Sequence, residues 1–162
     1  MSIKLLIVGH GRSGKDEAGN YLEYIGKLKF AGTTSKYLTP YVASFMGVSD
    51  ELAYEERHRY RDIWYGVGKR LRENDPGILL RQSLRCGDIV GGIRDRSEVV
   101  YARENSLVDL VIWIANDRVE LDPTLEFGSE VADVVVENHW SLPAYHDKLL
   151  RLAACLGILK AD

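Results

Sequence analysis

The sequence predicts an α/β fold in which a parallel sheet of about five strands carries helices on both faces. Short apolar runs alternate along the chain with stretches whose apolar residues recur at helical spacing, a pattern typical of strand–helix–strand units. A glycine-rich turn stands where the first apolar run meets the first helical stretch. The length of 162 residues is that of one domain, so we expect residues 1–162 to form a single unit.

Each predicted strand is a short apolar run, at 3–8, 28–31, 88–93, 107–114 and 131–136. The predicted helices span 16–25, 36–46, 55–72, 76–84 and 97–104, and a last helix is capped by Ser141. That last helix has one packing stripe, formed by Leu142, Tyr145, Leu149, Leu152 and Leu156. Since ligands of open parallel sheets bind at the carboxyl ends of the strands, we expect the functional residues at that edge.

Composition excludes several classes of protein. Hydrophobic residues make up 46% and charged residues 28% of the chain, which is ordinary for a soluble globular domain. The apolar runs are far shorter than the ~20 residues that a membrane span needs. Cys86 and Cys155 alone form no disulfide framework, and residues 1–4 lack the pattern of a signal peptide, so a cytoplasmic location and no membrane partner are expected.

The charge is unevenly distributed. The net charge is −3, yet the segment 57–85 alone carries about +5. A basic segment on an acidic protein favours a local anionic ligand, although a solvated helix face explains the same pattern.

A phosphate-binding motif occupies the turn after the first predicted strand. Residues 9–15 read G-H-G-R-S-G-K, which matches G-x-x-x-x-G-K. Glycines let the backbone N–H groups point at phosphate oxygens, the helix N-terminus adds partial positive charge, and the lysine bridges the β- and γ-phosphates. The predicted ATP-binding residues here are Gly9, Gly11, Arg12, Ser13, Gly14, Lys15, Asp16 and Glu17.

One position departs from the usual motif. Asp16 stands where Ser or Thr normally binds magnesium. An aspartate can hold Mg²⁺ directly or through water, because magnesium prefers oxygen ligands. We therefore predict Mg²⁺ as a cofactor, with Asp16 as a ligand and Lys15 and Asp16 as catalytic residues.

Three segments of the chain carry a family resemblance. The loop ends in S-G-K-D, residues 132–138 read A-D-V-V-V-E-N before Ser141-Leu142, and Phe30-Ala31 follows the start of the second predicted strand. Together they resemble phage-type deoxynucleoside monophosphate kinases, although Trp140 stands where that family often has glycine. Animal-type phosphomevalonate kinases share only the G-K-D ending. The resemblance implies a P-loop kinase fold with a short lid.

Arg94 follows the third predicted strand in G-G-I-R-D. The resemblance implies a phosphate- or substrate-binding arginine near this point, so Arg94 is predicted to act in both catalysis and substrate binding. A surface ion pair with Asp95 or Glu98 is the alternative. Asp95 is a second candidate metal ligand, acting through water, because the usual aspartate at the end of that strand is absent.

The helix expected at 55–72 is the predicted wall of the acceptor site. Arginines beside an aromatic ring suit a nucleotide, with guanidinium groups on phosphate and the ring against the base. The substrate-binding candidates on this helix are Arg57, Arg61 and Trp64, although Trp64 is equally well explained as core. Thr33, Thr34 and Ser35 follow the second predicted strand and are further candidates, or simply form a turn.

Two more segments are expected near the donor nucleotide. Related kinases place a lid after the fourth strand; here that segment is short, and Arg118 is its one cation. By the same analogy, Asn138 and Trp140 follow the fifth strand and are expected near the adenine base. His10 and His58 have no visible partner in the sequence and are treated as non-catalytic.

Three functions remain open at this point. The leading hypothesis is ATP-dependent phosphoryl transfer to a deoxynucleoside monophosphate. The second is a kinase that phosphorylates the hydroxymethyl group of 5-hydroxymethyluridine in phage DNA, with Asp16 or Asp62 accepting the proton. The third is a non-catalytic nucleotide-binding switch, although residues 115–118 lack the lysine of a guanine-reading motif. The sequence does not determine the oligomeric state.

Overall fold

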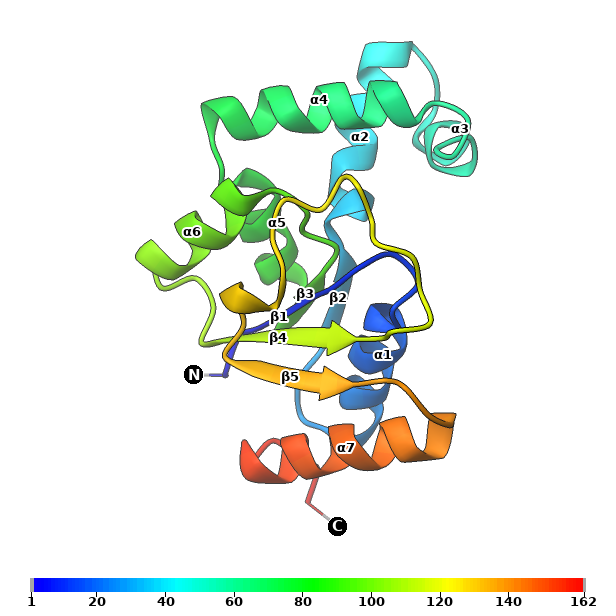
Figure 1. The fold of residues 1–162 in the computed structure, drawn as a ribbon. Helices are drawn as coiled ribbons and strands as arrows, with labels where there is room; N and C mark the ends of the chain where they lie inside the picture. The colour runs from blue at the N-terminus through cyan, green and yellow to red at the C-terminus, as the bar shows by residue number, and fades with distance from the viewer. Residues whose placement is uncertain (1, 162) are drawn as a thin grey trace.

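The computed structural model describes residues 2–161 and shows an α/β fold built on a five-stranded parallel sheet (Figure 1). The strand order is β2-β3-β1-β4-β5, and all four pairings are parallel. The strands are β1 (Leu5–Val8), β2 (Phe30–Thr33), β3 (Ile89–Gly91), β4 (Leu110–Ala115) and β5 (Val134–Glu137). The predicted fold class is therefore confirmed.

The central strand β1 explains why the apolar runs are uninterrupted. All four of its side chains are fully buried, and Leu6 pairs with Val90 of β3 and Val111 of β4. A strand covered on both faces has no solvent side, so no polar residue alternates with its apolar ones.

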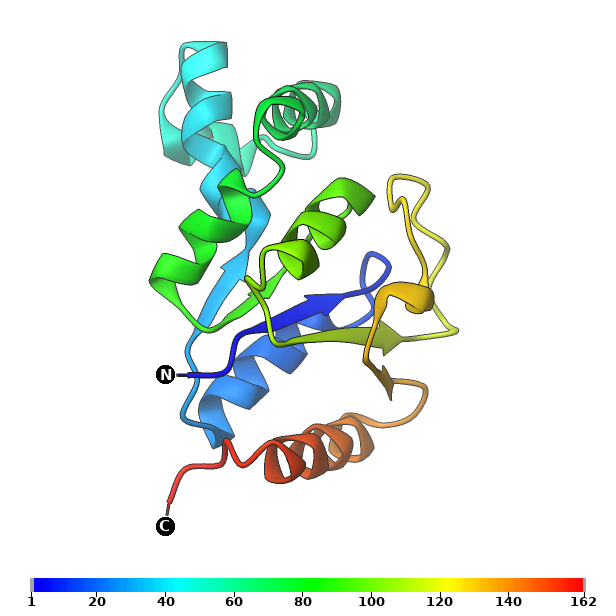
Figure 2. The ribbon, with the colours of Figure 1, turned by 90° about the vertical axis from the view of Figure 1, so that its left-hand side faces the viewer.

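Two layers of helix cover the sheet (Figure 2). On one face, α1 (Lys15–Ile25) and α7 (Leu142–Cys155) pack over a core that includes Leu22 and Leu149. On the other face lie α5 (Ile78–Cys86) and α6 (Arg96–Glu104), which bury Leu80 and Val99. The predicted stripe of the last helix is only partly buried, because Leu142 lies in its exposed first turn.

A third hydrophobic cluster lies beyond the sheet and builds a helical extension, seen at the top of Figure 1. It is formed by α2 (Thr34–Met46), α3 (Asp50–Glu55) and α4 (Arg61–Asn74) together with the start of α5. Leu38, Val42 and Trp64 are its buried centre. This extension stands over the carboxyl-end side of β2 and so forms one wall of the region next to the glycine-rich loop.

The predicted range of the helix at 55–72 is wrong. Residues 56–60 are turns between α3 and α4, and Arg57 therefore lies outside both helices. The segment from Glu55 to Arg59 contains five charged or imidazole side chains and no apolar residue. Because helical stability in a protein comes mostly from packing an apolar face, nothing holds this stretch against the core.

The other boundaries move by a few residues. The second strand begins at Phe30, so Thr34 and Ser35 are the first turn of α2 rather than a loop. The third strand ends at Gly91, three residues before Arg94, and a short 3₁₀ helix η1 (Ser129–Val131) precedes β5. None of the helices within residues 2–161 is long and apolar enough to cross a membrane.

Candidate functional site

The glycine-rich loop joins β1 to α1 and needs glycine at two of its positions. Gly9 has φ +151°, and a Cβ there would stand 2.8 Å from the carbonyl oxygen of Ile114. Gly14, the N-cap of α1, has φ +105°, and its Cβ would stand 2.6 Å from the amide nitrogen of Asn138. Both backbone conformations are ones that L side chains rarely adopt. The motif therefore has the curled geometry that sequence analysis predicts.

Two side chains hold the back of this loop. Asn138 Nδ2 donates to the carbonyl oxygen of Ser13 (2.9 Å), and the Tyr145 hydroxyl donates to that of Gly14 (2.8 Å). Burial raises the pKa of Tyr145, so its hydroxyl keeps the proton that it donates. Asn138 was expected near the adenine base; the structure gives it this loop contact instead. Sequence reasoning treated Tyr145 only as part of the packing stripe.

The Ser13 hydroxyl has no hydrogen-bond partner within the described part of the chain. The residue is 1% exposed, and its Oγ is fully enclosed. Buried hydroxyl groups are normally hydrogen-bonded, and leaving one unpaired costs about 1–3 kcal/mol. Because this oxygen is enclosed, a ligand could reach it only if the loop shifts.

Lys15 is folded onto its own loop. Its Nζ donates to the carbonyl oxygens of Gly9 (2.9 Å) and His10 (2.5 Å). Burial and the neighbouring positive charge of Arg94 lower the pKa of Lys15 to about 8, against the opposing effect of nearby Asp16. The ammonium group is thus desolvated and positioned, while it still carries its charge at neutral pH.

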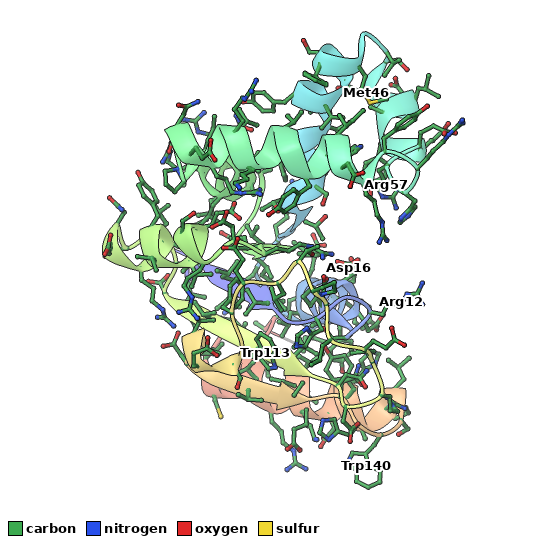
Figure 3. All side chains as sticks on the ribbon, turned by 45° about the horizontal axis from the view of Figure 1, so that its top comes forward. Arg12, Asp16, Met46, Arg57, Trp113 and Trp140 are labelled. Carbon is green, nitrogen blue, oxygen red and sulfur yellow. The ribbon has the colours of Figure 1, made fainter. Side chains whose placement is uncertain are left out.

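The remaining loop residues point in different directions. Asp16 is exposed in the first turn of α1, and Arg12 is exposed with φ +62° and points away from Asp16 in Figure 3. Glu17, predicted to bind the nucleotide, instead pairs with His146 Nε2 of α7 at 2.5 Å. His146 also stacks on Tyr21 with 3.8 Å between ring centroids, so this pair belongs to the packing of α1 on α7.

A cleft of about 570 Å³ opens beside the loop, between the sheet edge and the helical extension. It is lined by Asp16 and Asn20 of α1, Phe30, Gly32 and Thr33 of β2, Lys36 and Thr39 of α2, and Asp50, Glu51 and Tyr54 of α3. Of these, sequence reasoning proposed Asp16 and Thr33. The others come from three helices and a strand that only the fold brings together.

Arg57 stands at the edge of this cleft. Its guanidinium lies 4.1 Å above the ring of Tyr54 and donates to the Tyr54 carbonyl oxygen (2.9 Å). In Figure 3 the side chain descends from the helical extension toward the side of Asp16. The predicted position of Arg57 next to the acceptor region is therefore compatible with the structure, although the residue is in a turn.

Of the other acceptor candidates, Trp64 and Thr34 have structural contacts, whereas Ser35 and Arg61 stay predictions. Trp64 is 8% exposed and packs in the core of the helical extension, so the core interpretation of this residue holds. Thr34 is buried and donates to the Gly92 carbonyl oxygen (3.3 Å). Ser35 accepts from the Thr39 hydroxyl through its carbonyl oxygen (3.1 Å), and Arg61 is exposed on α4.

Asp95 is also occupied by structural contacts. It caps α6 by accepting from the amide and hydroxyl of Ser97 (2.8 and 2.6 Å), and it accepts from Arg72 Nε (3.3 Å). Arg72 lies 3.8 Å from Glu98 as well, and burial raises the pKa of Glu98 to about 7. This Arg72 cluster joins α4 to α6 and leaves Asp95 few free oxygen lone pairs for a metal.

Arg94 does not pair with Asp95 or Glu98. Its Nη1 donates to the Asp122 carboxylate and to the Thr124 hydroxyl (2.6 Å), both in the segment 116–128 between β4 and η1. This segment is where the resemblance places a short lid, a role that stays a prediction. Asp122 was missed because an aspartate in a loop has no periodicity or motif that would single it out.

Arg118, in the same segment, faces the loop after β5 rather than a phosphate site. Its Nη2 donates to the carbonyl oxygens of Asn138 (3.1 Å) and Trp140 (3.3 Å). Trp140 is 72% exposed and lies apart from Arg12 and Asp16 in Figure 3. The contacts of Arg118 thus hold the Asn138–Trp140 loop against the segment 116–128.

The residues present suit magnesium only together with a phosphate ligand. No group of three His, Cys, Asp or Glu side chains within residues 2–161 is arranged to hold a metal ion alone. Mg²⁺ is usually held by one or two carboxylates together with substrate phosphates and water. The exposed Asp16 carboxylate at the end of the loop fits that requirement; Asp95, with its lone pairs engaged, fits it poorly.

Comparisons with known proteins find similarity in structure but not in sequence. No protein-family model matches the chain, and no curated protein sequence matches it. Among solved structures, the chain is similar to the shikimate kinase from Bacteroides thetaiotaomicron, with a TM-score of 0.48 and 12% sequence identity. The alignment covers 96% of this chain and 99% of the shikimate kinase. A likeness this distant concerns the arrangement of strands and helices and leaves the substrate open.

Proposed function

We propose that the protein is an ATP-dependent kinase that transfers the γ-phosphoryl group to a nucleotide acceptor. The observation that carries this proposal is the curled glycine-rich loop at the N-terminus of α1 with its desolvated Lys15 ammonium, whose hydrogen-bond partners within residues 2–161 are two carbonyl oxygens of the same loop. A triphosphate supplies further oxygens to this ammonium group, and the N-terminus of α1 favours its negative charge.

The proposed step is an in-line displacement at the γ-phosphorus. The acceptor oxygen forms a new P–O bond as the bond to the β–γ bridging oxygen breaks, and that oxygen leaves with ADP. Lys15 and Arg94 carry positive charge beside the loop and stabilise the charge on the transferring group. When bound, Mg²⁺ supplies further charge neutralisation to the β- and γ-phosphates, and Asp16 is the residue placed to hold it.

A deoxynucleoside monophosphate is the first acceptor candidate. The resemblance in the loop, at Phe30-Ala31 and around Asn138 supports it, and Arg57 at the rim of the cleft offers a guanidinium for its phosphate. The reacting group is already an anion, so this reaction needs no general base.

The lining of the cleft favours a second candidate, a hydroxyl acceptor on a nucleotide or within DNA. Three carboxylates, from Asp16, Asp50 and Glu51, face the cleft against one ammonium group, from Lys36. Such a lining repels a phosphate as the reacting group and accommodates a neutral hydroxyl group there. The phosphates that a nucleotide or DNA also carries would have to lie outside the lining, toward Arg57 at the rim. In that reaction the hydroxyl proton passes to a carboxylate, for which Asp16 lies nearest the loop.

The two candidates are separated by one assay. The protein is incubated with Mg²⁺ and γ-labelled ATP, with deoxynucleoside monophosphates or with DNA that does or does not contain 5-hydroxymethyluridine. Label on a free monophosphate supports the first candidate, and label on hydroxymethylated DNA alone supports the second. ATP binding with no transfer to any acceptor contradicts both and returns the protein to the class of nucleotide-binding switches.

For the hydroxyl acceptor, Asp16→Asn is the informative variant and Asp50→Asn is its matched control. If Asp16 accepts the proton, Asp16→Asn lowers the rate about 100-fold even at saturating Mg²⁺, and Asp50→Asn changes it far less. A rate that higher Mg²⁺ restores in Asp16→Asn means that Asp16 acts as a metal ligand and not as the base. Equal effects of the two substitutions would contradict the role of Asp16 as the base.

A further inference from the structure

The segment 116–128 contacts the glycine-rich loop through Asp122. The backbone N–H of Asp122 donates to His10 Nδ1 (3.0 Å), and the His10 ring meets Trp113 of β4 edge to face at 5.3 Å. His10, which the sequence suggests is non-catalytic, thereby links the glycine-rich loop to this segment. The acceptor role of Nδ1 places the ring proton of the neutral imidazole on Nε2.

The Asp122 carboxylate is held in one orientation. Its Oδ1 accepts from the amide (3.0 Å) and the hydroxyl (2.7 Å) of Thr124, and its Oδ2 accepts from Arg94. The side chain is only 13% exposed, whereas that of Arg94 is 52% exposed. The less mobile partner of this ion pair is therefore the carboxylate, and the long arginine side chain takes its direction from it.

This ion pair stands at the mouth of the loop. The Asp122 Oδ2 lies 3.5 Å from the point where a Cβ of Gly11 would be. Both Asp122 and Arg94 are near enough to act on the charge of Lys15, Asp122 raising its pKa and Arg94 lowering it. The guanidinium of Arg94, held by Asp122 and Thr124, therefore lies within electrostatic range of the lysine that a γ-phosphate would contact.

A second bond fixes the chain on the other side of Arg94. The Arg94 carbonyl oxygen accepts from the amide of Glu126 (2.9 Å), and Phe127 is buried in the core beneath. Backbone and side chain of Arg94 are therefore both held by the segment 122–127. An arginine that must meet a developing charge is most effective when it is oriented before the reaction.

We propose that Asp122 is a positioning residue that, through Thr124 and His10, aims the Arg94 guanidinium at the transferring phosphoryl group. This inference rests on the proposed kinase function. Asp122 contacts Arg94 and the loop and acts through Arg94 without touching substrate. The short segment after β4 then contributes an anchored carboxylate, Asp122, that orients Arg94, the arginine that follows β3. A longer lid would carry its own cations instead.

The first test is a mutant cycle on phosphoryl transfer. Arg94→Ala is expected to lower kcat about 100-fold, and Asp122→Asn about 10-fold with less than about a twofold change in the KM for ATP. In the Arg94→Ala background, Asp122→Asn has almost no further effect, because the residue acts through Arg94. Thr124→Val removes a hydroxyl that holds the Asp122 carboxylate and is also expected to lower kcat. It replaces Asp122→Asn in the cycle if that variant fails to fold.

Asp133→Asn is the matched control. Asp133 also accepts from an arginine, Arg103 (3.1 Å), and from a backbone N–H, that of Val111 (2.8 Å), but it precedes β5 at the opposite end of the strand from the loop. Its substitution removes the same kind of ion pair and leaves kcat unchanged.

The second test needs no catalytic activity. Amide hydrogen exchange of residues 119–126 in the intact protein is expected to be several-fold faster in Asp122→Asn than in the wild type, and unchanged there in Asp133→Asn. Unchanged exchange in Asp122→Asn contradicts the anchoring role even if the protein proves not to be a kinase. Multiplicative effects in the cycle, or a lower KM for ATP in Asp122→Asn, contradict the positioning role and make Asp122 an independent ligand or a competitor of phosphate.

Discussion

The two sides of the site are built differently. On the loop side, β1, β5 and α7 hold the backbone of residues 9–15, and Asn138 and Tyr145 bond its carbonyl groups from behind. On the cleft side, the lining comes from α1, β2, α2 and α3, and most of its polar groups are exposed. A loop with a fixed backbone thus faces a cleft whose side chains are free to adapt. On the proposed function, backbone geometry specifies the nucleotide donor and side chains specify the acceptor.

The largest expected effect is on the loop side. Lys15→Ala is predicted to lower phosphoryl transfer at least about 100-fold, since it removes the cation nearest the transferring group. Far-UV circular dichroism and the unfolding midpoint should stay close to the wild type, because the lysine bonds only loop carbonyls. Lys36→Ala, on the cleft side, is the comparison: it should raise the KM of the acceptor and spare the KM of ATP. Full activity of Lys15→Ala would refute the assignment of the loop.

An effect of intermediate size is expected for two tyrosines, one on each side of the site, whose hydroxyl groups make similar hydrogen bonds. Tyr145→Phe removes the hydroxyl that bonds Gly14, and Tyr37→Phe removes one that bonds the Ala31 carbonyl at 2.9 Å in β2. Each loss is expected to cost about 1 kcal/mol in the free energy of unfolding. Only Tyr145→Phe should also weaken ATP binding, by several-fold in a calorimetric titration. Equal weakening by both would mean that the loop is no more sensitive than the rest of the fold.

The last effect is on stability alone and concerns the attachment of the helical extension, where Arg72 of α4 meets Glu98 of α6. Burial raises the pKa of Glu98 from 4.5 to about 7, so the native state binds a proton more tightly than the unfolded chain. The stability from this group is therefore full below about pH 4.5 and declines as the pH rises toward 7, by at most about 3 kcal/mol. Urea unfolding at pH 5 and 7.5 should show a smaller decline for Glu98→Gln. An unchanged slope would mean that Glu98 does not titrate in this range.

The same difference between the loop and the cleft explains which features could be predicted from the sequence. The loop was predictable because seven consecutive residues and their place between a strand and a helix determine its geometry, and the fold class was predictable from the periodicity of the apolar residues. The cleft was not, because Asn20, Lys36 and Tyr54 are ordinary surface residues until three segments meet. Asp122 and Trp64 show two limits of prediction from sequence. An isolated loop carboxylate was overlooked, and an aromatic residue among arginines fitted substrate binding and core packing equally well until the structure placed it in a core.

The central claim is that the loop of residues 9–15 binds the phosphates of a nucleotide, and an equilibrium titration tests it directly. Isothermal calorimetry of the wild-type protein with ATP, ADP and adenosine in the presence of Mg²⁺ should show ATP and ADP binding at least about 100-fold more tightly than adenosine, because the loop contacts phosphate and not the base. Absence of ATP binding, or equal affinity for all three compounds, would contradict the account.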